Sequence, residues 1–179
     1  MVLVVRQNSF FGAGAGFSNV DGSDNTLFGF DAGRNDLDIT PTGSRNTIMG
    51  SGAGNRIIGG DNTFVGYRAG RSDGLGTGTA NTLIGASTSN FRGQGSYNTF
   101  IGYGTGTINS SLDYATAIGA GAVVSTGSTV QLGRAAGDDT VLVPGRLLVK
   151  NGGFTILENG NVGIGTNPTF RLDVADRVR

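Results

Sequence analysis

A five-residue pattern, Asn-Thr-apolar-apolar-Gly, recurs along most of this chain and limits its possible folds more than any other feature. Clear copies begin at residues 8, 25, 46, 62, 81, 98 and 115, and an eighth fits at residue 129. Each copy is rich in β-branched or aromatic residues and is closed by Gly, which is typical of a short strand ending in a turn. One such unit cannot bury an apolar face alone, so the pattern predicts an all-β solenoid of about eight stacked parallel coils.

The linkers between copies carry fewer apolar residues, which we interpret as a second, weaker strand in each coil. These residues are Val20, Ile39, Ile57, Ile58, Leu75, Phe91, Ile108 and Val124. Each coil would then consist of one strand, a Gly turn, a second strand and a return loop.

The two apolar residues of each copy should point to opposite faces, because successive side chains of a strand alternate. One face carries the first apolar residue: Phe10, Leu27, Ile48, Phe64, Leu83, Phe100 and Ala117. The other carries Thr and the second apolar residue: Phe11, Phe28, Met49, Val65, Ile84, Ile101, Ile118 and Leu132. A coil has one interior, so we expect another copy of the chain to cover the second face, most simply in a homotrimer.

The flanking Asn and Gly of each copy have local roles in this interpretation. Asn can hydrogen-bond its own backbone two residues on and tolerates left-handed conformations, so we expect it at the entry corner of the strand. Gly adopts positive φ without a Cβ penalty, so we expect it at the exit corner.

Composition excludes several classes of protein. Gly accounts for 34 of 179 residues but only three are Pro, and no Gly-X-Y triplet runs through the chain, which excludes collagen. Thirteen basic residues balance thirteen acidic ones, so we expect no nucleic-acid partner. No apolar run approaches membrane-spanning length, so we expect no membrane insertion. Cys and His are absent, which removes thiol nucleophiles, His bases and the usual zinc sites.

The pattern changes after Gly133. Asn151-Gly152 and Asn159-Gly160 each separate apolar runs, and such pairs favour hairpins. We therefore divide the chain into a lead-in strand over residues 1–7, a β-roll over 8–133, and a small β-meander or neck over 134–179 that closes the solenoid.

At this point two family resemblances become visible. The unit Asn98-Thr-Phe-Ile-Gly-Tyr103 resembles the left-handed β-roll head repeats of YadA-like trimeric autotransporter adhesins, and Ala115-Thr-Ala-Ile-Gly-Ala-Gly-Ala122 resembles their short repeat. The longer units, followed by the neck from Gly160 to Val174, are similar to bacteriophage-type tail-fibre proteins, in which this neck often precedes an endosialidase-type intramolecular chaperone. Together the resemblances cover about residues 8–175.

The resemblance implies a homotrimer, an extracellular or virion location, and adhesion to a cell-surface glycan or protein receptor. The sequence ends at Arg179 without a chaperone, and shows neither a signal peptide nor an anchor, so we expect a fragment, a processed product or an engineered piece. The main expectation is a tail-fibre-like structural and adhesive segment. A surface-adhesin head is the first alternative, and a polysaccharide-degrading tailspike, which needs a carboxylate cleft, is less favoured.

We expect no catalytic, cofactor or metal site. The carboxylates at Asp36/Asp38 and Asp138-Asp139 are typical of turns. The acidic loops Asp21–Asp24 and Asp31–Asp38 could offer oxygen ligands to calcium but lack EF-hand and RTX spacing.

Two binding hypotheses remain from the residues themselves. The first is ice binding by a Thr column, against which we count the large apolar residues on the same face and an uneven repeat spacing that should break a flat surface. The column is Thr26, Thr47, Thr63, Thr82, Thr99 and Thr116. The second is ligand contact near the loops between coils, at residues for which buried packing is the competing role: Tyr67, Arg92, Tyr97 and Tyr103.

Overall fold

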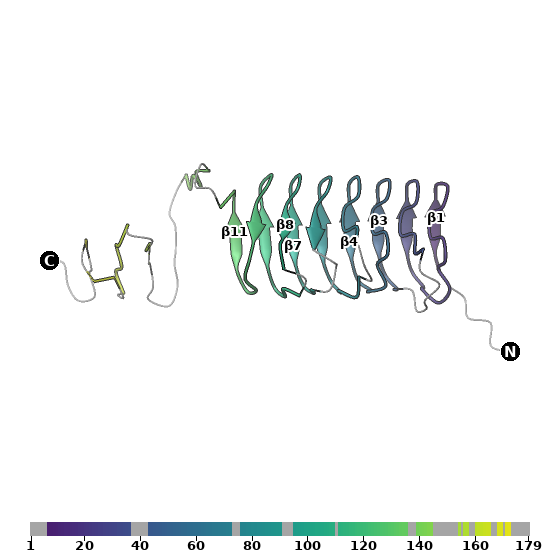
Figure 1. The fold of residues 1–179 in the computed structure, drawn as a ribbon, viewed down its shortest axis with the longest axis horizontal. Helices are drawn as coiled ribbons and strands as arrows, with labels where there is room; N and C mark the ends of the chain where they lie inside the picture. The colour runs from purple at the N-terminus through teal and green to yellow at the C-terminus, as the bar shows by residue number, and fades with distance from the viewer. Residues whose placement is uncertain are drawn as a thin grey trace. The chain divides into compact units, whose positions relative to one another are not determined.

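The computed structural model is an all-β solenoid. It describes residues 7–36, 43–72, 76–90, 95–109, 111–135 and 139–144, together with 154, 156, 157, 160–165, 168, 169, 171 and 172, and none of these is helical. Eight short parallel strands form one sheet, in which each strand is hydrogen-bonded to the next along the stack (Figure 1). These strands are β1 (Ser9–Phe11), β2 (Thr26–Phe28), β3 (Thr47–Met49), β4 (Thr63–Val65), β5 (Thr82–Ile84), β7 (Thr99–Ile101), β9 (Thr116–Ile118) and β11 (Val130–Leu132).

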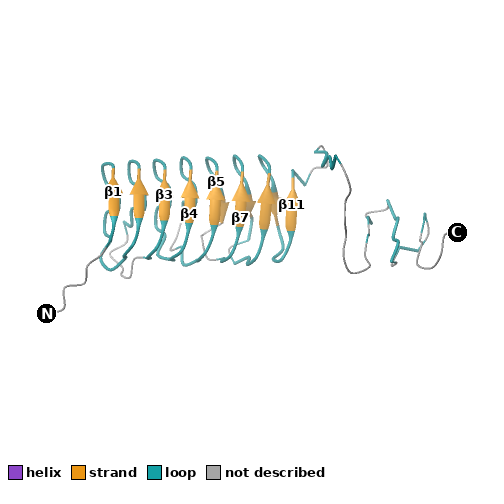
Figure 2. Ribbon diagram, turned by 180° about the vertical axis from the view of Figure 1, so that it is seen from behind, coloured by secondary structure: helices purple, strands orange, loops and turns teal. Residues whose placement is uncertain are grey.

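The strands pair in strict register although the linkers between them differ in length. Thr pairs with Thr from β2 to β9, and each apolar residue pairs with its counterpart in the neighbouring copy. Every strand therefore enters the sheet at the same point, whatever the number of residues that precede it (Figure 2). The expectation that uneven spacing breaks the outer face is wrong, because loops absorb the difference.

A second, three-stranded parallel sheet occurs beside the later part of the stack. It contains β6 (Ser89–Asn90), β8 (Gly106–Thr107) and β10 (Val123–Val124), and an isolated bridge joins Ile57 to Gly76. Of the linker residues, Ile57 and Val124 are buried, whereas Val20 and Ile108 are exposed. The expected second strand of each coil is thus found only in part of the described linkers; Ile39, Leu75 and Phe91 lie outside the described residues.

The interior of the solenoid is built from the first apolar residue of each copy. Leu27, Ile48, Phe64, Leu83, Phe100 and Ala117 are all buried. Small residues three positions after the motif Gly, such as Ala53 and Ala69, are fully buried as well and complete the same core. Phe10 is the exception, being exposed on β1, because no coil stacks on the outer side of the first strand.

Each motif Gly closes its strand with positive φ, as expected. The values lie between 116° and 137° from Gly12 to Gly119. This conformation brings successive corners so close that a Cβ on Gly85 would collide with the carbonyl oxygen of Gly102. Any side chain at this position would both strain the backbone and separate the coils.

The motif Asn residues form a ladder that joins one coil to the next. The side-chain oxygen of Asn62 accepts a hydrogen bond from the backbone N–H of Asn81 at 2.9 Å, and the Asn62 amide donates to the carbonyl oxygen of Gly78 at 3.1 Å. Equivalent bonds to the next backbone N–H run from Asn8 as far as Ala115, where Asn98 is the last acceptor.

The expected role of Asn at the entry corner was therefore wrong in two respects. The side chains bond to the neighbouring coil instead of their own backbone. The left-handed residue is the one before Asn, for example Arg45 with φ 58° and Asp61 with φ 62°. A buried amide needs partners for its oxygen and its NH₂ group, and the adjacent coil offers both.

The chain divides into two compact units, Met1–Val141 and Leu142–Arg179. Within the described part of the second unit no residue is assigned to a strand, and the backbone N–H of Val162 donates to the carbonyl oxygen of Arg171 at 3.2 Å. The hairpin turns expected at Asn151-Gly152 and at Asn159 fall outside the described residues, as do residues 1–6 of the expected lead-in strand. The β-meander stays a prediction.

Candidate binding surfaces

The outer face of the sheet carries an unbroken line of large apolar side chains, which we call the outer stripe. It consists of the second apolar residue of each copy: Phe11, Phe28, Met49, Val65, Ile84, Ile101, Ile118 and Leu132. Val65 is half-buried, and the exposed fraction of the other seven lies between 37 and 68 %. The six strands between β1 and β11 bury their central residue, so one face of each is packed and the other is open.

Contacts within the outer stripe run along the stack. The rings of Phe11 and Phe28 lie parallel, with centroids 4.8 Å apart and planes 9° from each other. The Thr column shares this outer face and is in register over six strands. A straight line of this many exposed apolar side chains is unusual on a monomeric protein and is typical of an interaction surface.

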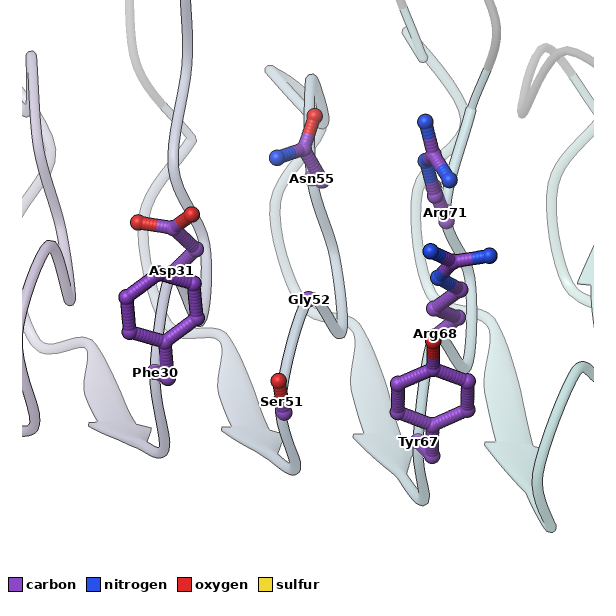
Figure 3. A pocket seen from close by; sticks show the side chains of 8 residues that line it. All are labelled: Phe30, Asp31, Ser51, Gly52, Asn55, Tyr67, Arg68 and Arg71. Atoms are coloured by element: carbon purple, nitrogen blue, oxygen red, sulfur yellow. The ribbon is translucent and has the colours of Figure 1, made fainter.

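A second feature lies at the corner that follows the motif Gly, where an open hollow of about 350 Å³ spans three successive coils. Figure 3 shows Phe30 on one side, Tyr67 on the other, and Ser51 with Gly52 on the coil between them. Both rings are seen broadly face-on in this view, and both side chains are exposed. The full lining is Phe30, Asp31, Ser51, Gly52, Asn55, Tyr67, Arg68 and Arg71.

Basic side chains outnumber acidic ones in the lining of this hollow. Asp31 pairs with Arg34, whose Nη1 lies 3.2 Å from the carboxylate and which also binds Asp36. Arg68 lies over the ring of Tyr67, with its guanidinium carbon 4.9 Å from the ring centroid. Neither Arg68 nor Arg71 forms an ion pair with any residue that the structure describes. The hollow therefore presents two cations that no described acidic residue pairs with.

The four residues predicted as ligand contacts lie in different places. Tyr67 lines the hollow, and Tyr103 occupies the equivalent corner position on β7's coil. Tyr97 lies in a different column and stacks on Tyr114, with centroids 4.9 Å apart. All three predicted tyrosines are exposed, so the competing role of buried packing is wrong within the single chain. Arg92 lies outside the described residues.

Phe30 and Arg68 were missed because the sequence prediction placed ligand contacts near the long linkers, one of which is Arg71 to Ala80. The hollow instead lies directly after the motif Gly. The signal was present in the column that follows this Gly, which we call the corner column: Ala13, Phe30, Ser51, Tyr67, Ala86, Tyr103, Ala120 and Arg134.

The acidic residues are held by neighbouring arginines instead of forming a cluster. Asp31 and Asp36 both bind Arg34, and Asp61 makes a two-pronged pair with Arg45 at 2.6 and 2.8 Å. The hydrogen bonds from Arg45 hold the pKa of the Asp61 carboxyl below its usual value. Across the described stretches of chain no three Asp, Glu, His or Cys side chains come together as a metal site would require.

Asp139, one of the paired carboxylates considered in the sequence, binds Arg134 at 3.1 Å. These hydrogen bonds lower the pKa of the Asp139 carboxyl. Its neighbour Asp138 and the Asp38 of the other pair lie outside the described residues.

Comparison with models of known protein families, with curated proteins and with solved structures found no match. A search of the described residues also found no helix of the length and apolarity needed to cross a membrane.

Proposed function

We propose that this chain is one third of a homotrimeric left-handed β-roll of about eight coils, which forms a structural and adhesive fibre segment outside the cell or on a virion. In this role it spaces and presents a surface that binds a receptor, and it catalyses no reaction. The outer stripe is the observation that carries the proposal, because a single chain leaves this line of side chains in water.

Burial of the outer stripe would favour self-association. Burying a large aliphatic or aromatic side chain contributes roughly 1.5–3 kcal/mol, and the stripe offers one such side chain on each strand. A second copy presents the same stripe with the same spacing, since the coils of both have one register. Two copies would cover a flat stripe as well as three would; the resemblance of Asn98–Tyr103 to YadA-like head repeats supports three.

The test is the solution mass of the chain, measured by light scattering after size-exclusion chromatography. We expect a mass near three times the 18.2 kDa of one chain. A matched variant, Ile101→Asp, places a charge in the stripe and should lower the mass to that of one chain while the β-sheet circular dichroism persists. A folded wild-type monomer would contradict the trimer.

The alternatives within this class differ mainly in what carries the fibre. A surface-adhesin head has the same physics, and the flanking sequence of the full-length protein would decide between the two. A polysaccharide-degrading tailspike needs paired carboxylates in a cleft, and the corner hollow contains one, Asp31, which is paired with Arg34. Turnover of a glycan by the isolated chain would establish the tailspike instead.

Ice binding is a second candidate, favoured by one specific observation: the Thr column lies in register on a solvent-exposed sheet. The bulky Phe11, Phe28 and Met49 on the same face oppose a flat match to an ice lattice. Thermal hysteresis of a monomeric sample, lost in Thr82→Leu, would support this candidate over the fibre. A trimer without thermal hysteresis would contradict it.

A further inference from the structure

The corner column alternates between small and large side chains along the stack. Ala13, Ser51, Ala86 and Ala120 are small, and the positions between them are Phe30, Tyr67, Tyr103 and Arg134. The three aromatic rings are 51 to 69 % exposed. Because the strands of these coils pair one after another, each ring is separated from the next by two coils, or about 9–10 Å at the usual strand spacing.

This spacing leaves a shallow seat between successive rings. The hollow between Phe30 and Tyr67 has the short residues Ser51 and Gly52 as its floor. A large side chain at Ser51 would fill it. The next interval repeats the arrangement, with Ala86 between Tyr67 and Tyr103.

Exposed aromatic rings at a fixed interval on a rigid scaffold suit a linear polymer whose units have apolar ring faces and polar edges. A pyranose has this character, since its C–H groups line one face and its hydroxyls point outward from the rim. An extended disaccharide spans about the distance from one ring to the next, so every second sugar of a polysaccharide could stack on an aromatic residue. A Tyr side chain matches such a sugar, because its ring offers an apolar face and its hydroxyl a polar edge.

The polar groups of the hollow specify the sugar further. Ser51 and Asn55 make no side-chain hydrogen bond to a described residue, so both can pair with sugar hydroxyls. Arg68 and Arg71 have no acidic partner in the described chain, and a guanidinium binds a carboxylate with paired, charge-assisted hydrogen bonds. The guanidinium of Arg68 covers one face of the Tyr67 ring, so a sugar on this platform would use the other face and keep the charge close by.

We propose that the corner column is a binding track for an acidic polysaccharide, with Phe30, Tyr67 and Tyr103 as stacking platforms and Arg68 and Arg71 as carboxylate contacts. This inference rests on the proposed function, because it assigns a ligand class to the surface that the fibre presents. It also requires the corner column to remain outside the contact between copies, which the outer stripe makes.

The test uses hexagalacturonate and its fully methyl-esterified form, titrated into the chain and followed by calorimetry at low salt. We expect the acid to bind and the ester to bind at least about tenfold more weakly. Tyr67→Ala should weaken the acid about tenfold. The double variant Arg68→Gln/Arg71→Gln should weaken the acid and remove its advantage over the ester.

The matched control is Tyr97→Ala, which removes an exposed Tyr from a different column and should leave the affinity unchanged. Tyr103→Ala should weaken hexagalacturonate more than digalacturonate, because the dimer can still occupy the seat between Phe30 and Tyr67. Absence of binding, equal binding of acid and ester, or equal effects of Tyr67→Ala and Tyr97→Ala would each overturn the track.

The light-scattering mass of every sample separates this inference from the fibre itself. A trimer that ignores hexagalacturonate overturns the track alone, and a monomer that binds it overturns the trimer alone. Loss of the trimer mass in Tyr67→Ala would place this ring between copies and overturn the track.

Discussion

The inner and outer faces of the eight-stranded sheet carry similar side chains in opposite environments. Phe100 and Leu83 are fully buried inside the coil, whereas their neighbours Ile101 and Ile84 lie on the outer stripe and are exposed. The inner face is packed within the chain, whereas the outer face is left exposed by it. Strand parity thus separates the residues that pack inside a coil from those that the proposed association would cover.

Among truncations to Ala on the two faces, Phe100→Ala should lower the free energy of unfolding most. Phe100 is fully buried, and truncating such a residue in a packed core typically costs about 3–5 kcal/mol. The free energy of unfolding, measured by urea denaturation, should fall by this amount at every protein concentration. The control is Phe28→Ala on the outer face, whose effect should grow as the protein becomes more concentrated. Equal effects of the two variants at all concentrations would remove the distinction between the faces.

Asn62→Ala should have the next largest effect. It deprives the buried N–H of Asn81 and the carbonyl oxygen of Gly78 of their partners, and each such orphaned group costs about 1–3 kcal/mol. Hydrogen exchange should accelerate first in the coils on either side of Asn62. Asn109→Ala provides the control, since the Asn109 amide is exposed and donates to the carbonyl oxygen of Ser125 at the surface. A ladder variant as stable as this control would mean that the coils are held by the strands alone.

Ile84→Asp on the outer face should change association more than folding. Ile84 is already in water in the single chain, so a carboxylate there should leave the circular dichroism of the coil nearly unchanged while the light-scattering mass falls. The matched change on the inner face, Ile48→Asp, buries an unpaired charge and should unfold the coil. Unfolding by both variants would show that the outer stripe is needed for the coil itself.

The smallest effect is expected from the Arg45–Asp61 pair, which belongs to neither face. Since Arg45 lowers the pKa of Asp61 in the folded chain, the pair stabilises the fold above the ordinary Asp range near pH 4, and this contribution is lost as the pH falls through the lowered value. Both side chains are exposed, so the loss should be a slight fall in Tm that Asp61→Asn no longer shows. A fall of the same size in Asp61→Asn would assign it to other carboxyl groups.

Much of this architecture could be predicted from local rules that apply within a single repeat. The motif repeats eight times, Gly at its end requires positive φ, and the alternation of Leu27 and Phe28 assigns each to a face. The in-register sheet was less accessible, because spacings of 16 to 21 residues do not reveal that the loops absorb every difference.

The ladder and the corner hollow could not be obtained from local rules. Asn62 finds its partners on Asn81 and Gly78, and only stacking brings these groups within reach. The hollow likewise depends on which residues of three separate coils become neighbours. Ser51 indicates no binding site when its own coil is considered alone. In the stack it lies between Phe30 and Tyr67 of the neighbouring coils and forms the floor of the hollow.

The Asn ladder makes the solenoid modular in length. Each Asn side chain receives the N–H of the following coil and gives its own amide to the same neighbour, so every rung presents an identical joint to the next. Removing one whole repeat, from Thr63 to Asn81, would rejoin Asn62 to Thr82 with both faces still aligned. Gene duplication or loss of single repeats could therefore shorten or extend such a solenoid by one strand spacing at a time, without redesign of its core or of its outer stripe.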